Sequence, residues 1–236
     1  MQIDFHTHLL PNLDDGSRSV EESREMLAAL QDQGVGRIVA TPHFYSHKAR
    51  LDDFLQKRKA AYDQLLALCP DAAQKLLLGA EVSFFRGMGK ADRIEELCIS
   101  GTKAMLIEMP FSQWGHSEVA ELHQILSRGI TPIIAHIERY FSFQKDLEAL
   151  NEIINLPVLL QINAQALQQW RTRRFVFKLM DHGFPVLLGT DCHNMQKRRP
   201  DMDAGRKILA QKYGQSCLTQ MDALGAKLLN MEKEKA

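Results

Sequence analysis

The chain has 236 residues, of which 45% are hydrophobic and 25% are charged, and this length is typical of one domain. The composition excludes a disordered chain, and a chain of this size can fill a core without disulfides or a structural metal. Lysine plus arginine equals aspartate plus glutamate at 29 each, which argues against binding of nucleic acid through an overall positive charge.

Nothing in the sequence predicts export or membrane insertion. Residues 1–6 lack the basic segment and the long apolar run of a signal peptide, and the longest apolar runs, such as 157–160, are too short to cross a bilayer. The four cysteines are scattered, without a Cys-x-x-Cys pair, as expected for reduced thiols. We therefore predict a soluble cytoplasmic protein that forms one domain over residues 1–236.

Short apolar runs alternate with longer amphipathic stretches along the whole chain. Seven runs are predicted as strands: 2–5, 37–41, 76–80, 104–107, 132–135, 158–162 and 186–188. Helices are predicted between and after them: 20–33, 51–68, 117–128, 146–154, 166–182, 202–213 and 216–230. The first helix follows the capping box Ser19-x-x-Glu22. Segments 83–103 and 109–116 fit the pattern poorly and are predicted as loops or short helices over an opening.

The predicted fold class is α/β. The strands are near-continuous apolar runs, as in parallel sheets that helices cover on both sides. Repeating units of this kind close into a barrel or spread into a doubly wound sheet, and the pattern alone leaves both open. In either arrangement the carboxyl ends of the parallel strands meet at one face, which holds the active site.

Every predicted strand is followed by polar residues, most of which can bind a metal ion. In chain order they are His6, His8, Asp14, Asp15, His43, Glu81, Glu108, His136, Glu138, Asn163, Asp191 and His193. Two pairs, His6-x-His8 and Asp191-x-His193, are alternate residues, whose side chains project to the same side of an extended segment. Imidazoles and carboxylates gathered in this way can hold two or three divalent ions, with carboxylates bridging between them.

Each of these residues also has an ordinary explanation. With nine histidines in the chain, one His-x-His is expected by chance in about a third of such sequences. A single Glu81 or Glu108 is as easily an exposed loop carboxylate. The prediction therefore depends on the joint pattern at all seven strand ends.

Basic residues follow two of these strand ends. Arg139 comes three residues after His136, where a guanidinium can bind two oxygens of a phosphate. The run Lys197-Arg198-Arg199 comes soon after Asp191-x-His193. By spacing alone each is equally an ordinary surface group, but the position next to the predicted metal site permits binding of an anionic substrate.

Cys192 and Arg198 have the Cys-x5-Arg spacing of cysteine-dependent phosphatases. That loop needs small residues whose backbone N–H groups surround a phosphate, and here the intervening residues include no glycine. Cys192 also lies between Asp191 and His193, so in an extended segment its side chain points away from both. A thiol nucleophile is therefore not predicted.

Several segments together match one known family. The most specific are Leu13-Asp14-Asp15-Gly16-Ser17 and the run over 129–140, and further matches lie at 3–8, 21–23, 40–43, 79–81, 106–108, 161–163 and 191–194. Through these segments the chain resembles the polymerase-and-histidinol-phosphatase (PHP) superfamily. Within it, the chain is most similar to the bacterial metal-dependent protein-tyrosine phosphatases of capsule and exopolysaccharide operons.

The resemblance implies a distorted (β/α)7 barrel, with parallel strands and outer helices, that holds two or three divalent ions. Manganese is the expected metal, and iron or zinc is possible. One ion would be held by His6, His8, Glu81 and Asp191. The second would be held by Glu81, Glu108 and His136, and the third by Asp15, His43 and His193. Arg139 and Arg199 would bind phosphate, with Arg198 as the alternative to Arg199 because the segment is one residue longer than expected.

The resemblance also implies the reaction, which is hydrolysis of a phosphomonoester by a hydroxide that bridges the ions. The expected substrate is phosphotyrosine in the C-terminal tail of an autophosphorylating tyrosine kinase of capsule or exopolysaccharide biosynthesis, with no nucleic acid partner. Two alternatives stay open. One is a phosphatase for histidinol phosphate or another small molecule on the same barrel. The other is a degenerate, non-catalytic barrel that binds phosphotyrosine or a protein partner.

Overall fold

The computed structural model describes residues 1–231, so the last five residues of the predicted domain lie outside the described part. All of its strand pairs are parallel. One sheet has the order β1-β2-β4 and the other the order β3-β5-β6-β7-β8-β9. The bounds are β1 Gln2–Thr7, β2 Val35–Ala40, β3 His43–Phe44, β4 Leu76–Leu78, β5 Glu81–Ser83, β6 Ala104–Glu108, β7 Thr131–Ile134, β8 Leu159–Asn163 and β9 Val186–Gly189.

The two sheets are parts of one ring. β2 continues into β3 beyond Pro42, which has no N–H to donate to a ladder, and β2 and β3 pair with β4 and β5 respectively. On the other side β1 lies beside the segment that follows β9, where Thr7 and Cys192 form a parallel bridge and Asp191 N–H donates to His6 O at 2.7 Å. The seven predicted strands therefore form a distorted (β/α)7 barrel, as expected.

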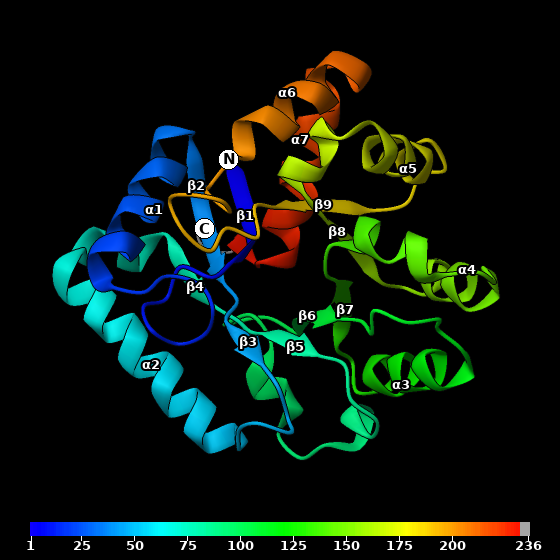
Figure 1. Cartoon of the computed structure of the whole chain (residues 1–236), viewed down its shortest axis with the longest axis horizontal. Helices are drawn as coiled ribbons and strands as arrows, with labels where there is room; N and C mark the ends of the chain where they lie inside the picture. The colour runs from blue at the N-terminus through cyan, green and yellow to red at the C-terminus, as the bar shows by residue number, and fades with distance from the viewer. Residues whose placement is uncertain (232–236) are drawn as a thin grey trace.

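Helices surround this ring (Figure 1). The α-helices of residues 1–231 are α1 Val20–Asp32, α2 Leu51–Leu68, α3 His116–Ser127, α4 Glu148–Asn155, α5 Trp170–Asp181, α6 Met202–Tyr213 and α7 Gln215–Leu228. Short 3-10 helices occupy the connections: η1 Pro70–Gln74, η2 Met88–Lys90, η3 Ile94–Leu97, η4 Ile137–Arg139, η5 Phe141–Phe143 and η6 Ala164–Gln168. Within residues 1–231, no helix combines the length and the apolar character needed to cross a membrane.

Local signals explain most helix boundaries, with one difference. The Ser19 hydroxyl accepts the Glu22 N–H at 3.1 Å, so the predicted capping box starts α1. The helix predicted over 166–182 is instead divided into η6 and α5. The break is at Gln169, whose backbone is extended (φ −90°, ψ 129°), and α6 packs closely on η6, where a Cβ at Gly205 would lie 2.7 Å from Ala164 O.

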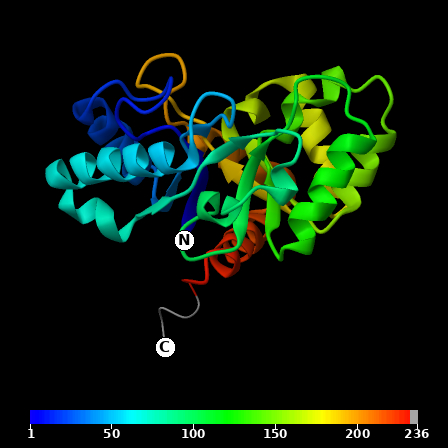
Figure 2. The same cartoon turned by 90° about the horizontal axis from the view of Figure 1, so that it is seen from below.

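Buried side chains form an inner and an outer core. The inner core fills the ring below its carboxyl end and includes Ile3, Phe5, Val39, Leu106, Ile133, Leu187 and Leu229. α7 closes the end at which the strands begin, since a Cβ at Gly225 would lie 2.9 Å from the Phe5 ring, and Figure 2 shows this helix beneath the ring. The outer core lies between strands and helices. All four cysteines are free.

The inner core predicts a clear stability effect. Leu106 is 0% exposed, so Leu106→Ala should lower the free energy of unfolding by about 2–5 kcal/mol, through lost burial and the cavity left behind. Urea unfolding measures this. Leu68→Ala is the control, because Leu68 at the end of α2 is 43% exposed and its truncation should change stability by less than about 1 kcal/mol. Equal losses in the two variants would contradict this description of the core.

Candidate metal centre

Titratable side chains meet where the strands end. Three groups each offer ligand atoms that lie within 4.8 Å of one another: His8, Asp15, His43 and His193; His6, His8 and Glu81; and His43, Glu81 and Glu108. The groups share members, so they form one continuous cluster. Together with His136 and Asp191 we call these residues the metal centre.

The first part of the metal centre is built on the alternate residues His6 and His8. Their Nε2 atoms are 3.0 Å apart. Each Nε2 lies 3.2 Å from Glu81 Oε2 and 3.5 Å from Asp191 Oδ1. Four side chains, which come from the end of β1, the start of β5 and the segment after β9, thus face one point, as expected for a cation site with two imidazoles and two carboxylates.

The other parts extend from Glu81. Its second oxygen, Oε1, lies 2.9 Å from His136 Nε2, which is 3.7 Å from Glu108 Oε1. Asp15 Oδ1 lies 3.4 Å from Nε2 of His43 and 3.4 Å from Nε2 of His193. All nine residues predicted as ligands therefore lie together in one cluster.

The chemistry of this donor set fits divalent metal ions. His43 Nδ1, Glu81 Oε2 and His193 Nε2 are buried and form no hydrogen bond of good geometry among residues 1–231, although His43 Nδ1 lies 3.0 Å from Glu81 Oε2. Leaving a buried polar atom unpaired costs about 1–3 kcal/mol, so these atoms need a further partner. Imidazole nitrogens and carboxylate oxygens suit manganese, iron and zinc alike.

Gln161 and Asn163 orient the metal centre from β8. Gln161 Oε1 lies 3.0 Å from His6 Nδ1 and accepts the His136 N–H at 2.7 Å. Asn163 Nδ2 donates to Asp191 Oδ2 at 2.9 Å. Such partners set the ring orientation and tautomer of the histidines that bind a metal. Gln161 is not among the residues predicted for the site, although it alternates with Asn163 along the strand and so projects to the same face.

Asp14 supports the metal centre from the other side. Its Oδ2 lies 2.7 Å from His8 Nδ1 and accepts the His43 N–H at 2.9 Å. Its Oδ1 accepts the Gly16 N–H at 2.9 Å. Burial opposes ionisation, but these partners lower the pKa of Asp14 to about 2. Asp14 and Asp15 therefore have different positions. Asp14 contacts His8 Nδ1 and the His43 backbone N–H, whereas Asp15 faces the imidazoles of His43 and His193.

An unusual backbone conformation directs the side chains of His136 and Asp191 toward the cluster. His136 and Asp191 have φ of +31° and +54°, a left-handed region that costs non-glycine residues on the order of 1–3 kcal/mol. Each lies just beyond the end of a strand. Gly189, two residues before Asp191, leaves no room for a side chain. A Cβ there would lie 2.6 Å from His6 Cβ and 2.7 Å from Gln161 Nε2.

Burial and charge shift the pKa values of the metal centre. Burial would raise the pKa of Glu81 and Asp191, but His6 and other neighbours lower both well below their usual values. Burial and the nearby Glu81 raise the pKa of Glu108 to about 7. Burial lowers the pKa of His193 to about 4, so its imidazole is neutral at physiological pH, as a metal ligand must be.

Two arginines reach the metal centre. Arg139 Nη2 lies 2.6 Å from Asp191 Oδ2, and Arg198 Nη2 lies 2.7 Å from Asp191 Oδ1. Arg199 is exposed and forms no ion pair within residues 1–231. The structure therefore places Arg198 at the site instead of Arg199. The physical reason is the turn after His193, whose N–H donates to Arg198 O at 2.8 Å and so directs that residue back toward the cluster.

Cys192 lies on the opposite side of its segment from the ligands. It is 0% exposed and packs in the outer core. Burial raises the pKa of its thiol far above the ordinary value, so the reactive thiolate is absent at neutral pH. The structure agrees with the prediction that Cys192 is not a nucleophile.

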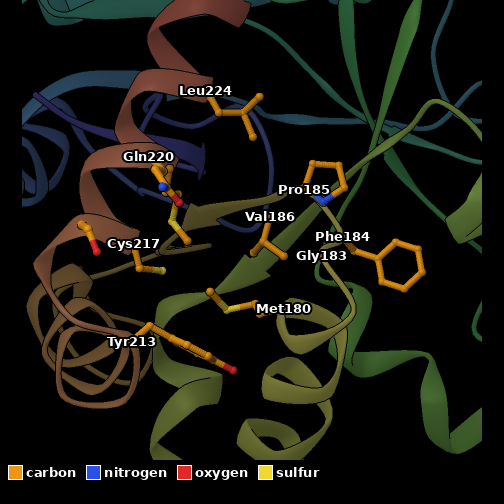
Figure 3. Close-up of a pocket in the computed structure, with 11 residues that line it drawn as sticks. Met180, Gly183, Phe184, Pro185, Val186, Tyr213, Cys217, Gln220 and Leu224 are labelled. Carbon is orange, nitrogen blue, oxygen red and sulfur yellow. The ribbon is translucent and has the colours of Figure 1, made fainter.

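Two hollows lie at the other end of the ring, where strands begin. One of about 390 Å³ lies among α5, α6, α7 and the start of β9 and includes Cys217 (Figure 3). The other, of about 560 Å³, lies beside the starts of β6, β7 and β8. Neither is lined by a histidine or a carboxylate among the described residues. The metal centre, unlike these two hollows, has side chains that can bind a metal ion or transfer a proton.

Comparisons with known proteins agree with this geometry. A family model described as capsular polysaccharide synthesis, CpsB/CapC, matches residues 2–229. The tyrosine-protein phosphatase CpsB of Streptococcus pneumoniae is 30% identical over 227 residues, which are 90% of this chain and 91% of that protein. The tyrosine-protein phosphatase YwqE of Bacillus subtilis is 27% identical over 219 residues, covering 90% and 85%.

The fold also matches a solved structure. It comes from a study of YwqE from Bacillus subtilis and CpsB from Streptococcus pneumoniae, described there as unique metal-dependent tyrosine phosphatases. The superposition has a TM-score of 0.86 at 24% identity and covers 97% of this chain and 94% of the other. This similarity supports the barrel fold.

Glu138, beside the metal centre, predicts a pH dependence of stability. Its Oε1 accepts the Asn163 N–H at 3.3 Å, Oε2 has no partner among residues 1–231, and burial raises its pKa from 4.5 to about 7. The folded state thus holds this proton more tightly than the unfolded state. Metal-free protein should lose stability as the pH rises from about 4.5 to about 7, by on the order of 3 kcal/mol from this group.

Glu138→Gln should reduce that decline, because the amide does not titrate. Urea unfolding of chelator-treated protein between pH 4.5 and pH 8 measures it. Glu148→Gln, on the exposed start of α4, should leave the decline unchanged. An identical pH profile for wild type and Glu138→Gln would show that the carboxyl does not titrate in this window.

Proposed function

The chain belongs to the CpsB/CapC family of capsular polysaccharide synthesis, and we propose that it is a metal-dependent protein-tyrosine phosphatase. The observation that carries the proposal is the cluster of nine ligand-type side chains beside two arginines, all at the carboxyl end of the barrel. Relatives named as tyrosine-protein phosphatases support the same choice.

The three parts of the metal centre are the proposed ion sites. His6, His8, Glu81 and Asp191 form the first site. The second consists of Glu81, Glu108 and His136, and the third of Asp15, His43 and His193. We propose two or three ions, manganese first, with iron or zinc also compatible with these donors. When bound, such ions lower the pKa of a water and neutralise phosphoryl oxygens.

Arg139 and Arg198 are proposed to bind and orient the phosphoryl group. They approach the two oxygens of Asp191, and their side chains remain 38% and 37% exposed. Guanidinium groups that touch the metal centre and also face solvent can donate to the equatorial oxygens of a phosphate. Negative charge is spread over these oxygens in the transition state, so stabilisation by the arginines accelerates the reaction.

No side chain is assigned as a nucleophile. The thiol of Cys192 is buried and protonated. We therefore propose direct transfer of the phosphoryl group to water, without a covalent phosphoenzyme.

The exposed edge of the site at Asp15 favours a protein substrate. Asp15 is 65% exposed, in line with room for more than a small molecule above the cluster. We propose phosphotyrosine in the C-terminal tail of a tyrosine kinase of capsule or exopolysaccharide synthesis as the substrate. The four free thiols suit the reducing cytoplasm as the compartment, and residues 1–236 are proposed to act as one phosphatase domain.

Metal removal tests the proposed function. Chelation should abolish hydrolysis of a phosphotyrosine peptide, and His6→Ala or Asp191→Ala should lower both metal content and kcat, the latter by more than about 100-fold. Cys192→Ser should keep activity within about threefold of wild type, because it removes no reacting group. Metal analysis and steady-state kinetics provide both readouts. Full activity after chelation would contradict the metal-dependent mechanism. A hundredfold preference for histidinol phosphate would instead identify a small-molecule phosphatase.

A matched pair of variants tests the arginines. Arg198→Ala should reduce kcat/KM for a phosphotyrosine peptide by about 100-fold, the usual effect of losing one charge-stabilising donor. Arg199→Ala removes the same charge from the neighbouring exposed position and should change kcat/KM by less than about threefold. The reverse order of effects would assign phosphate binding to Arg199.

A further inference from the structure

Exposed apolar side chains follow three neighbouring strands of the barrel. Among residues 1–231 there are seven exposed large hydrophobic residues, and five of them follow β6, β7 and β8: Phe111, Phe141, Phe143, Leu147 and Trp170. These strands lead into α3, α4 and α5, which are neighbours around the ring (Figure 1). Clustered exposed apolar groups commonly mark a binding surface.

Phe111 differs from the other four because it contacts the metal centre. Its ring stacks on the His136 imidazole, with centroids 5.9 Å apart and planes at 20°. It also packs on Tyr140 at 5.0 Å, and Phe143 stands edge-on at 5.8 Å. The Tyr140 hydroxyl accepts the Met109 N–H at 3.0 Å, which holds the segment that presents Phe111. Despite these contacts Phe111 is 45% exposed.

A second aromatic residue near the metal centre, Tyr45, already has partners for its ring. Tyr45 stacks on His43 at 5.1 Å, and Lys48 Nζ lies 4.2 Å from the centroid of the Tyr45 ring. His43 and His136 approach different oxygens of Glu81. Phe111 is therefore the aromatic side chain in contact with the cluster that keeps a large exposed surface for a ligand.

We propose that Phe111 is the wall of the site on which the aromatic ring of the substrate packs, and that it sets the preference for aryl over alkyl phosphates. This rests on the proposed function. Phe111 is exposed and stacks on His136. A phenyl ring that leaves the cluster on the His136 side therefore meets Phe111 first. Offset or edge-to-face packing of two rings adds affinity beyond the burial of area, and an alkyl phosphate gains none of it.

The test compares ligands that differ only in the ring. Metal-loaded protein is titrated with phenylphosphonate and with methylphosphonate, neither of which is hydrolysed, and the ratio of the two Kd values is measured. Wild type should bind phenylphosphonate about tenfold more tightly. Phe111→Ala should bring the ratio close to one, Phe111→Leu should lower it part of the way, and Phe111→Trp should keep it. The leucine variant retains apolar packing on His136, so it separates the ring from mere bulk.

Phe141→Ala is the matched control. Phe141 is the same residue type, is 47% exposed, and packs on Phe175 of α5 at 4.8 Å, so its loss should leave the ratio unchanged. A wild-type ratio near one, or a ratio unaffected by Phe111→Leu in protein with full metal content, would overturn the assignment of Phe111.

Kinetics distinguish that failure from failure of the proposed function. If wild type hydrolyses a phosphotyrosine peptide in preference to the matching phosphoserine peptide and Phe111→Leu does the same, only the role of Phe111 is rejected. If metal-loaded wild type hydrolyses neither peptide, the proposed function is rejected together with the inference. A selective loss for phosphotyrosine, with hydrolysis of the phosphoserine peptide unchanged in Phe111→Leu, supports both.

Discussion

One buried carboxylate organises this protein. Glu81 is 1% exposed, and imidazole nitrogens of His6, His8 and His43 lie within 3.2 Å of one of its oxygens, with His136 at the other. Hydrogen bonds among these groups cannot satisfy every donor and acceptor, and burying charged or polar groups without partners is costly. Cations shared between the groups, as proposed for this site, would remove this cost. The parallel strands bring these groups together because their carboxyl ends meet at one face.

The barrel separates stability from chemistry. Below the metal centre the inner core is apolar and α7 closes the far end. Above it, His136 and Asp191 adopt a strained backbone, and acidic side chains lie within a few ångströms of one another. A fold can tolerate such local destabilisation only when burial elsewhere exceeds it. In a barrel that surplus comes from side chains that point inward along every strand.

The surroundings of the metal centre offer the two kinds of contact that the proposals use. Arg139 and Arg198 provide positive charge on the side of Asp191, and Phe111 provides an exposed aromatic surface on the side of His136. Charge alone attracts any phosphate, whereas an aromatic wall distinguishes what the phosphate is attached to. A site with both is suited to phosphate on an aromatic side chain.

The sequence by itself determined what depends on local pattern. α2 and α6 begin and end where periodicity predicts, and ligand types after each strand marked the metal centre because parallel strands share one face. Tertiary structure decided the rest. The predicted helix before β9 breaks at the extended residue Gln169, where η6 packs against α6, and the choice of Arg198 over Arg199 comes from the turn after His193. Gln161 gained its role only when β8 met β1 and β7 around the barrel. The positions of these side chains depend on contacts between residues far apart in the chain, which local spacing does not encode.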